Sequence, residues 1–397
     1  MFKLAGIWNH LKGDKVIWIV TLIMLVFSLV TVYSFVPVLV RSEGGTPMKY
    51  LMKHFVYVII GLFAMFWIHK QNPANISRFS KVIFYLAIGL LIFTFFFGVR
   101  VNDASRWIRI PVVSLTFQTS DFAKLALVIY VSRLLVKKKD MLNNWKEGFM
   151  PIALAIMMIV GLIVKDNFST AALLVLIAGV MLFIGKVPFK MLASFAGILV
   201  GAFMLVVLVH KTFPDANILN RWDTWEKRIL NQAADDSEKL VIDNIQSMNA
   251  ELAIHNGGIL GQGPGKGRLK LYTAEAYADF FYASFVEEFG LFGGVILVFV
   301  YLILLFRIIR IGLKSERLFE TYLALGIGLI IMTQATVNMF VCTGLFPVTG
   351  QNMPILSLGG SALVMVCVSL GVIQSIARDQ NGERVIEIGE ESENEEN

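Results

Sequence analysis

Long uncharged apolar runs alternate with short charged segments along most of the chain. A membrane-spanning helix needs about 20 apolar residues, because every backbone amide must be bonded inside the segment. The 57-residue uncharged stretch 321–377 is long enough for two spans divided near Pro347 and Pro354. Seven further runs lie at 16–40, 54–69, 82–99, 148–164, 167–185, 191–210 and 289–306.

A tenth span is predicted at 119–136, although Asp121, Lys124 and Arg133 interrupt it. Leucine and valine cover most of its circumference, and a polar face is tolerated where neighbouring helices shield it from lipid. An even number of spans puts both termini on one side. The pattern therefore predicts an all-α polytopic membrane protein of about ten helices, with residues 1–380 as a single transmembrane domain.

Lys and Arg then orient the bundle, because short cytoplasmic loops carry an excess of them. With a cytoplasmic N-terminus, the inner side collects 19 of these residues against 7 in the short outer loops. Both termini are predicted to be cytoplasmic and the long loop 211–280 to face outside. The Glu-rich tail 381–397 is predicted to be disordered.

Composition agrees with a membrane protein. Hydrophobic residues make up 56% of the 397 positions and charged residues 16%, against about 45–50% and 25% in soluble domains. Two cysteines exclude a disulfide framework and a cysteine-based metal site. The net charge of +6 reflects cytoplasmic loops, and no nucleic-acid binding is expected.

A glycine-rich loop at 257–267 precedes two more cations, Arg268 and Lys270. Glycine permits nests of N–H groups that hold phosphate, and Lys266 adds positive charge. Gly263 and these three cations are therefore candidates for binding a pyrophosphate. A flexible hinge beside the membrane explains the same glycines equally well.

The segment 273–282 offers a candidate for acid–base chemistry. If a helix begins near Thr273, that residue can cap it, and Glu275 and Asp279 lie four residues apart on one face at the membrane edge. A carboxylate acts as a general base where a hydroxyl lies within reach. Asp279 precedes two phenylalanines and has the more apolar setting; solvation of a helix end is the alternative.

Polar groups inside the spans suggest a shared cavity. Asp121 and Lys124 are three residues apart and can pair, and Asp166 opens the sixth span. Such residues either hold the bundle together or contact substrate. The loop 344–361 has no charge but many glycines and prolines, and this irregular backbone requires protein or water around it at membrane depth.

These blocks resemble the SEDS family of bacterial membrane proteins (shape, elongation, division and sporulation) over residues 16–380. The resemblance rests on four motifs: Ser105-Arg-Trp-Ile108 with Phe117-Gln-Thr-Ser-Asp-Phe-Ala-Lys124; Lys165-Asp-Asn-Phe-Ser-Thr170; Gly257–Gly267 with Glu275–Glu288; and Gly344–Ser361. Tyr277 departs from the family, which frequently has His there. A phenol with a reference pKa near 10 could not replace His as a proton acceptor at neutral pH.

The resemblance implies a peptidoglycan glycosyltransferase that polymerises lipid II outside the cytoplasmic membrane, with Asp279 as the essential residue. Asp279 would take the proton of the acceptor hydroxyl in one inverting displacement that releases undecaprenyl pyrophosphate. A divalent cation, Mg²⁺ or Mn²⁺, could assist there, but no metal ligands are predicted. Substrate binding is predicted for Arg106, Lys124, Asp166, Gly263, Lys266, Arg268, Lys270, Glu275, Thr349 and Ser357.

The resemblance also implies a class B penicillin-binding transpeptidase as partner, together with other division proteins, membrane lipid and a septal location in the inner membrane. The whole chain is more similar to the division branch (FtsW) than to the elongation branch (RodA), although Pro347-Val-Thr-Gly350 follows the elongation pattern. Two rival functions remain, a lipid II flippase and a non-catalytic division scaffold. Neither requires a general base at the outer edge.

Overall fold

The computed structural model describes all residues except 1–10, 102–103, 111–114, 213–237, 274–275 and 383–397. Its longer helices are α2 (Lys15–Glu43), α3 (Pro47–His69), α4 (Pro73–Phe97), α5 (Thr119–Lys137), α6 (Met150–Val164), α7 (Phe168–Ile184), α8 (Phe189–Thr212), α10 (Glu238–Gly257), α11 (Phe281–Lys314), α12 (Leu318–Cys342) and α13 (Gly360–Gln380). Three single-turn helices lie at Lys139–Met141, Trp145–Phe149 and Leu269–Leu271.

Each of the ten predicted spans corresponds to a helix. Eight helices in the described ranges are long and apolar enough to cross a membrane, and α7 is a shorter apolar helix of 17 residues. The remaining span, α5, carries the three predicted charges and is nevertheless buried along most of its length. Its neighbours supply the apolar surroundings that its own composition lacks, and the all-α membrane fold is confirmed.

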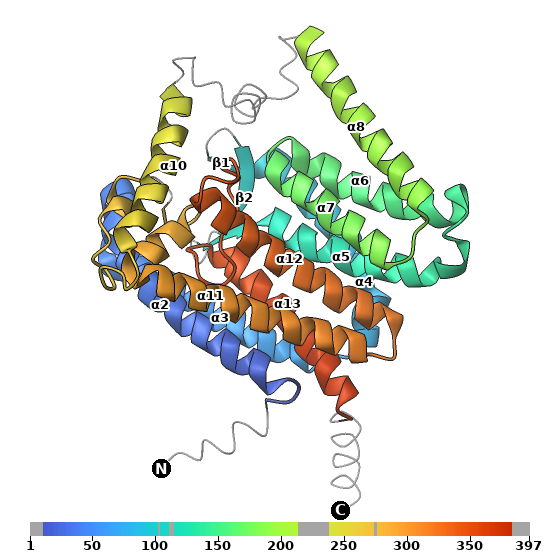
Figure 1. The fold of residues 1–397 in the computed structure, drawn as a ribbon. Helices are drawn as coiled ribbons and strands as arrows, with labels where there is room; N and C mark the ends of the chain where they lie inside the picture. Colours follow the sequence, from blue (N-terminus) through green and yellow to red (C-terminus); the bar gives the residue numbers. More distant parts are fainter. Residues whose placement is uncertain (1–10, 102–103, 111–114, 213–237, 274–275, 383–397) are drawn as a thin grey trace, which may run out of the picture.

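The helices pack around α13, which is the most buried of the apolar spans. Glycines permit this: a Cβ at Gly360 would lie 2.1 Å from the ring of Tyr57 on α3, and one at Gly371 would lie 2.9 Å from the carbonyl oxygen of Met65. Helix α8 is at the other extreme, with 6% of its apolar window buried. Figure 1 shows it leaning away from the bundle.

The two ends of the bundle are tied by different means. At one end, here called the terminal end, Asp14 caps α2 and pairs with Arg307 of α11, while its backbone exchanges two hydrogen bonds with the side chain of Gln374 on α13. The start of the first span and the end of the last therefore meet at the same end, as an even number of spans requires.

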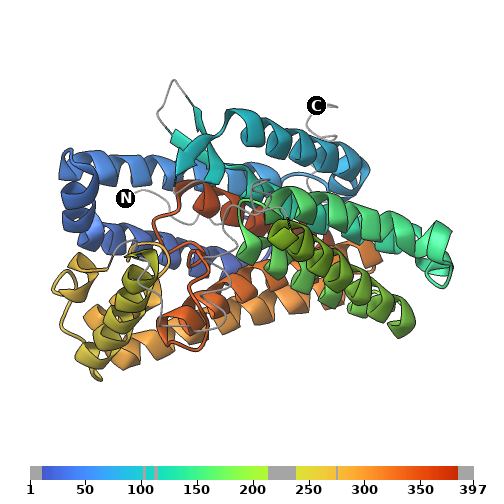
Figure 2. The same cartoon turned by 90° about the horizontal axis from the view of Figure 1, so that it is seen from above.

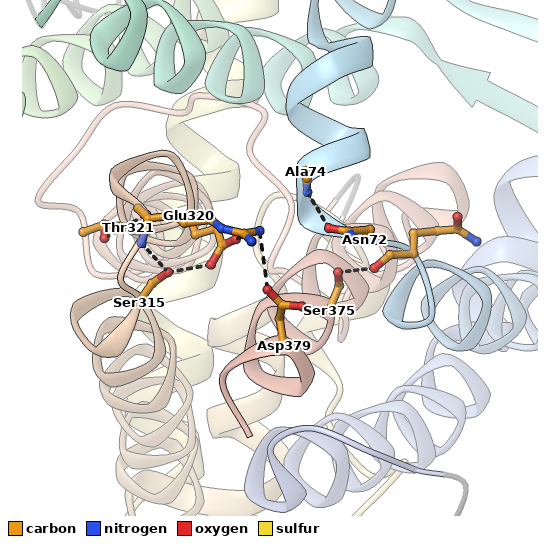
Figure 3. Close-up of polar contacts among 9 residues, drawn as sticks. Asn72, Ala74, Ser315, Glu320, Thr321, Ser375 and Asp379 are labelled. Carbon is orange, nitrogen blue, oxygen red and sulfur yellow. Dashed lines mark hydrogen bonds and ion pairs between the residues drawn. The ribbon is translucent and has the colours of Figure 1, made fainter. Parts of the chain in front are cut away.

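Further polar contacts lie at this end, as Figure 3 shows. Arg317 lies 3.4 Å from a carboxylate oxygen of Glu320 and 3.5 Å from one of Asp379, and the hydroxyl of Ser375 donates to the carbonyl of Gln71. These contacts join the α11–α12 loop to α13 and α13 to the end of α3.

The opposite end, the loop end, carries a small sheet that the sequence analysis did not predict. Strands β1 (Val99–Val101), β2 (Ala104–Ile110) and β3 (Leu115–Gln118) pair antiparallel in the order β1-β2-β3, with Trp107 opposite Gln118. Alternating polar and β-branched or aromatic residues favour strands here. The sheet leads directly into α5, and from above it lies beside α13 and α4 (Figure 2).

Helix α11 is broken at Gly290, whose φ of +72° is outside the helical region. The glycine-rich loop supplies the hydrogen bonds that the break removes. Amides of Gln262 and Gly263 donate to the carbonyls of Glu287 and Glu288, and amides after the break donate to the carbonyls of residues 258 and 259. The loop is therefore a fixed support for α11, not a flexible hinge.

This close approach leads to a stability prediction. Gly261 and Gly265 have similar φ angles, +79° and +77°, but a Cβ at Gly261 would lie 2.3 Å from the carbonyl oxygen of Glu288, whereas one at Gly265 would meet nothing within 4 Å. Gly265→Ala should cost about 1–2 kcal/mol, the strain of a left-handed residue. Gly261→Ala should cost about 1–3 kcal/mol more through overpacking. Thermal unfolding in detergent measures both, and equal losses would contradict the packing described.

Candidate functional site

Asp279 lies at the loop end in a turn just before α11, with 9% of its surface exposed. The condition that a helix begins near Thr273 is not met, because α11 begins at Phe281. Residues 276–280 form turns, and the Thr273 hydroxyl donates to the carbonyl of Leu269 instead of capping a helix. The side-chain amide of Asn338 donates to the carbonyls of Ala278 and Asp279, so these groups are bonded outside any helix.

The carboxylate of Asp279 faces the loop between α12 and α13. A Cβ on Gly350 would lie 3.8 Å from its Oδ2 atom, and Gly350 has a φ of +68° that favours glycine. Gly350 also lines a small polar cavity of about 20 Å³ inside the bundle. The irregular backbone of residues 344–359 thus borders both the carboxylate and the cavity.

Polar residues line this cavity from five elements. They are Gln118 at the end of β3, Asp121 and Lys124 at the start of α5, Thr170 on α7, Gln334 on α12, and Gln351, Asn352 and Ser357 in the loop. The predicted pair is confirmed, because Nζ of Lys124 lies 2.7 Å from Oδ1 of Asp121 and both side chains are buried. Oδ2 of Asp121 has no hydrogen-bond partner among the described residues.

A second, apolar cavity of about 700 Å³ lies between α7, α11 and α12. Residues 346–349 close its end at the loop, and Thr349 is one of the few polar residues in its lining. The Thr349 hydroxyl is buried without a hydrogen-bond partner in the described part of the chain. Thr349 and Gly350 are neighbours, so the apolar and polar cavities approach each other beside Asp279.

Arg106 and Asp166, both predicted to bind substrate, contact each other. Nε of Arg106 donates to the backbone carbonyl of Asp166 at 3.0 Å, and a second nitrogen of the guanidinium donates to the same oxygen. This contact joins strand β2 to the turn between α6 and α7, which brings these two predicted residues to the same end as Asp279.

The predicted cations of the glycine-rich loop separate into two groups. Lys266 and Arg268 are exposed, whereas Lys270 is buried. The Lys270 ammonium pairs with Glu288 and donates to Ser34, over the ring of Phe35. The amide of Gly263 already donates to a carbonyl, so an anion held by this loop would be bound by the side chains of Lys266 and Arg268.

Two predictions fall outside the described residues. Glu275 is one, and most of the acidic tail 381–397, from residue 383 onwards, is the other. Within the described ranges, no group of three His, Cys, Asp or Glu side chains is arranged to hold a metal ion.

Sequence reasoning did not identify Gln334, Asn338 and Gln351. All three lie in the uncharged run 321–377, and a search for charged residues does not detect neutral polar ones. An uncharged amide inside a membrane span also requires hydrogen-bond partners. Gln334 and Asn338 are four residues apart and so lie on one face of a helix, and two amides on one face of an apolar span are the signal that could have identified them.

Comparison with known proteins identifies the family. A family model described as "Cell cycle protein", labelled FtsW, RodA and SpoVE, matches residues 14–382. The chain belongs to this family. The resemblance to the FtsW and RodA branches is thereby confirmed.

Relatives in the family match nearly the whole chain. A "Probable peptidoglycan glycosyltransferase FtsW" of Geobacter sp. (strain M18) is 30% identical over 93% of this chain and 98% of the relative. The same named protein of Trichlorobacter lovleyi is 29% identical over 92% and 93%. "Stage V sporulation protein E" of Bacillus subtilis is 28% identical over 92% and 97%.

Two solved structures have the same fold. A chain from "Structural coordination of polymerization and crosslinking by a peptidoglycan synthase complex" aligns with a TM-score of 0.69 at 21% identity, covering 93% of this chain and 98% of that one. The rod shape determining protein RodA of Thermus thermophilus aligns with a TM-score of 0.64 at 21% identity, covering 93% and 97%.

Proposed function

We propose that this protein is a peptidoglycan glycosyltransferase that polymerises lipid II into β-1,4 glycan strands at the outer face of the cytoplasmic membrane. The observation that carries the proposal is the position of Asp279, whose carboxylate faces Gly350 where a polar and an apolar cavity approach each other. A substrate with a sugar, a pyrophosphate and a polyprenyl chain requires both kinds of surroundings. The names of the relatives support the same activity.

In the proposed reaction Asp279 acts as the general base. Its carboxylate takes the proton from the 4-hydroxyl of the acceptor's GlcNAc, and that oxygen forms a bond with the anomeric carbon of the donor MurNAc. The bond from this carbon to the pyrophosphate breaks, and undecaprenyl pyrophosphate leaves with the electron pair. A single displacement converts the α-linked donor into a β-1,4 linkage.

The cavities suggest how the donor would lie. Its polyprenyl chain would occupy the apolar cavity between α7, α11 and α12, and Thr349 at the end of that cavity would meet the pyrophosphate. Lys124 is the buried cation of the polar cavity and would stabilise the charge that develops on the leaving group. Arg106, Lys266 and Arg268 would meet phosphate oxygens from the loop end.

The orientation follows from the charge distribution and is part of the proposal. Both termini would be cytoplasmic and Asp279 would face the periplasmic side of a multi-pass inner membrane protein. The relatives named FtsW favour the division branch at the septum over the elongation branch. A class B penicillin-binding transpeptidase is the proposed partner, since the similar solved chain belongs to a peptidoglycan synthase complex; other division proteins would assemble with it.

Purified protein tests the activity directly. The full chain in detergent, given lipid II with and without the transpeptidase, should produce glycan strands that are resolved on a gel and digested by a muramidase. Two results would contradict the proposal. A flippase would move labelled lipid II across a vesicle membrane without forming polymer, and a scaffold would do neither while still supporting division.

A further inference from the structure

The side chain of Asn338 is fully buried on α12, one turn before its end at Cys342. Its Nδ2 atom lies 3.2 Å from the carbonyl oxygen of Ala278 and 3.0 Å from that of Asp279. It also lies 2.9 Å from the carbonyl oxygen of Gln351. Its Oδ1 atom accepts the amide of Tyr282 at 3.3 Å.

These bonds fix both sides of the candidate site. Ala278 and Asp279 belong to the turn that carries the carboxylate, and Tyr282 is in the first turn of α11. Gln351 follows Gly350, the residue that the carboxylate faces. The side-chain amide of Asn338 therefore bonds both the backbone of Asp279 and the backbone of the loop that the Asp279 carboxylate faces.

Two further contacts extend the arrangement. The thiol of Cys342, one turn along α12, lies 3.9 Å from the carbonyl oxygen of Asp279. The side chain of Gln351 donates to the hydroxyl of Thr170 at 2.8 Å, which connects the loop to α7 and the polar cavity. Asn338 of α12 is therefore the centre of a buried hydrogen-bond network that joins α12 to the start of α11, to the α12–α13 loop and, through Gln351, to α7.

The turn also has a backbone bond to the loop between α12 and α13, because the amide of Leu358 donates to the carbonyl of Tyr277 at 3.0 Å. Residues 276–279 form turns and are not part of a helix. Carbonyls that are not bonded to a helix require another donor when they are buried. A primary amide has two N–H donors and one acceptor oxygen, so it can bond groups of both kinds at once. Its bonds to three carbonyls require that one N–H be shared between two of them.

We propose that Asn338 is a positioning residue that sets the distance between the Asp279 carboxylate and the loop at Gly350, and through it the rate of glycosyl transfer. The proposal rests on the proposed function. Among the described residues, the polar atoms of Asn338 form hydrogen bonds only with backbone groups and the Cys342 thiol, so its effect on the reaction passes through Asp279. A displacement of about 1 Å at a reacting group can lower a rate by about 100-fold.

The test measures kcat and KM for lipid II with the full-length protein. Asn338→Leu keeps approximate size but removes every hydrogen bond of the amide. Asn338→Ser leaves a hydroxyl donor and adds no bulk, so it can be measured if the leucine variant fails to fold. We expect kcat to fall by about 10- to 100-fold for Asn338→Leu and by less for Asn338→Ser, while KM changes by less than about threefold.

Gln374→Leu is the matched control. Gln374 is another fully buried amide, and its side chain exchanges two hydrogen bonds with the backbone of Asp14 at the terminal end. Gln374→Leu should lower the unfolding temperature as the Asn338 variants do, but should leave kcat unchanged. The proposal is overturned if Asn338 variants keep the kcat of this control, or if they lose activity through KM alone.

Asp279→Asn in the same series separates the two proposals. An active Asp279→Asn variant, or a wild-type chain that forms no polymer, would overturn the proposed function. An inactive Asp279→Asn variant together with normal kcat in the Asn338 variants would overturn the positioning role only.

Discussion

Replacing Asp279 by Asn should lower the rate of lipid II polymerisation by about 100- to 10,000-fold, the usual contribution of a general base. Asparagine has nearly the same shape, so the backbone contacts with Asn338 and the approach to Gly350 can persist. The substitution removes only the ability to accept the proton. KM for lipid II should therefore change little while kcat collapses, as measured by initial rates of polymer formation.

Glu251→Gln provides the control for this experiment. Glu251 is an exposed carboxylate on α10, close to Gly344 at the beginning of the α12–α13 loop. It is at the same end of the bundle as Asp279, and its substitution should leave the rate within about twofold of wild type, because surface substitutions of this kind have small effects. A polymerisation rate for Asp279→Asn equal to that of Glu251→Gln would show that Asp279 is not the base.

Replacing Lys270 by Met should lower the free energy of unfolding by about 3–5 kcal/mol, the usual effect of breaking a buried ion pair. The Glu288 carboxylate would remain buried, and Ser34 would be its remaining polar side-chain partner among the residues that the structure describes. Adding Glu288→Gln to Lys270→Met removes that uncompensated charge and keeps a polar group for Ser34. The double variant should recover most of the lost stability, which thermal unfolding in detergent can measure.

Arg317→Met is the comparison for an exposed pair. Arg317 is 59% exposed and pairs with Glu320 and Asp379 at the terminal end (Figure 3). Exposed pairs contribute about 0–1 kcal/mol, so its loss should be small. If Lys270→Met were as mild as Arg317→Met, the buried pair would contribute little, and a substrate-binding role for Lys270 would become the better interpretation.

The fold could be predicted from the sequence to the extent that a membrane constrains it. Span length is set by the thickness of the bilayer, so even α5 with its charges was found. The sheet was missed because its strands β1 and β3 have only three and four residues, too few for a clear alternating pattern. The break at Gly290 was missed because it depends on a loop that is distant in sequence and returns to bond Glu287 and Glu288.

The charged residues of the candidate site could be predicted from the sequence, whereas its uncharged amides could not. Asp121 and Lys124 are conspicuous because ionic groups at membrane depth are expensive. Asp279 is marked by the two phenylalanines that follow it at the membrane edge, and Arg106 by its place in a motif of the family. Asn338 carries no charge, and the three carbonyls to which it donates come from two separate segments. The start of α11 was placed too early for the same reason, since tertiary bonds to Asn338 replace the helical ones that local sequence favours.

The support of α11 by residues 258–263 has a consequence for the length of that loop. Most surface loops tolerate an inserted residue, because closing a slightly longer loop changes the entropy little. Here the amides of Gln262 and Gly263 and the carbonyls of residues 258 and 259 each meet a fixed partner across the break. One additional residue would put all of these donors and acceptors out of step, so this stretch should vary in composition at its exposed positions but not in number of residues.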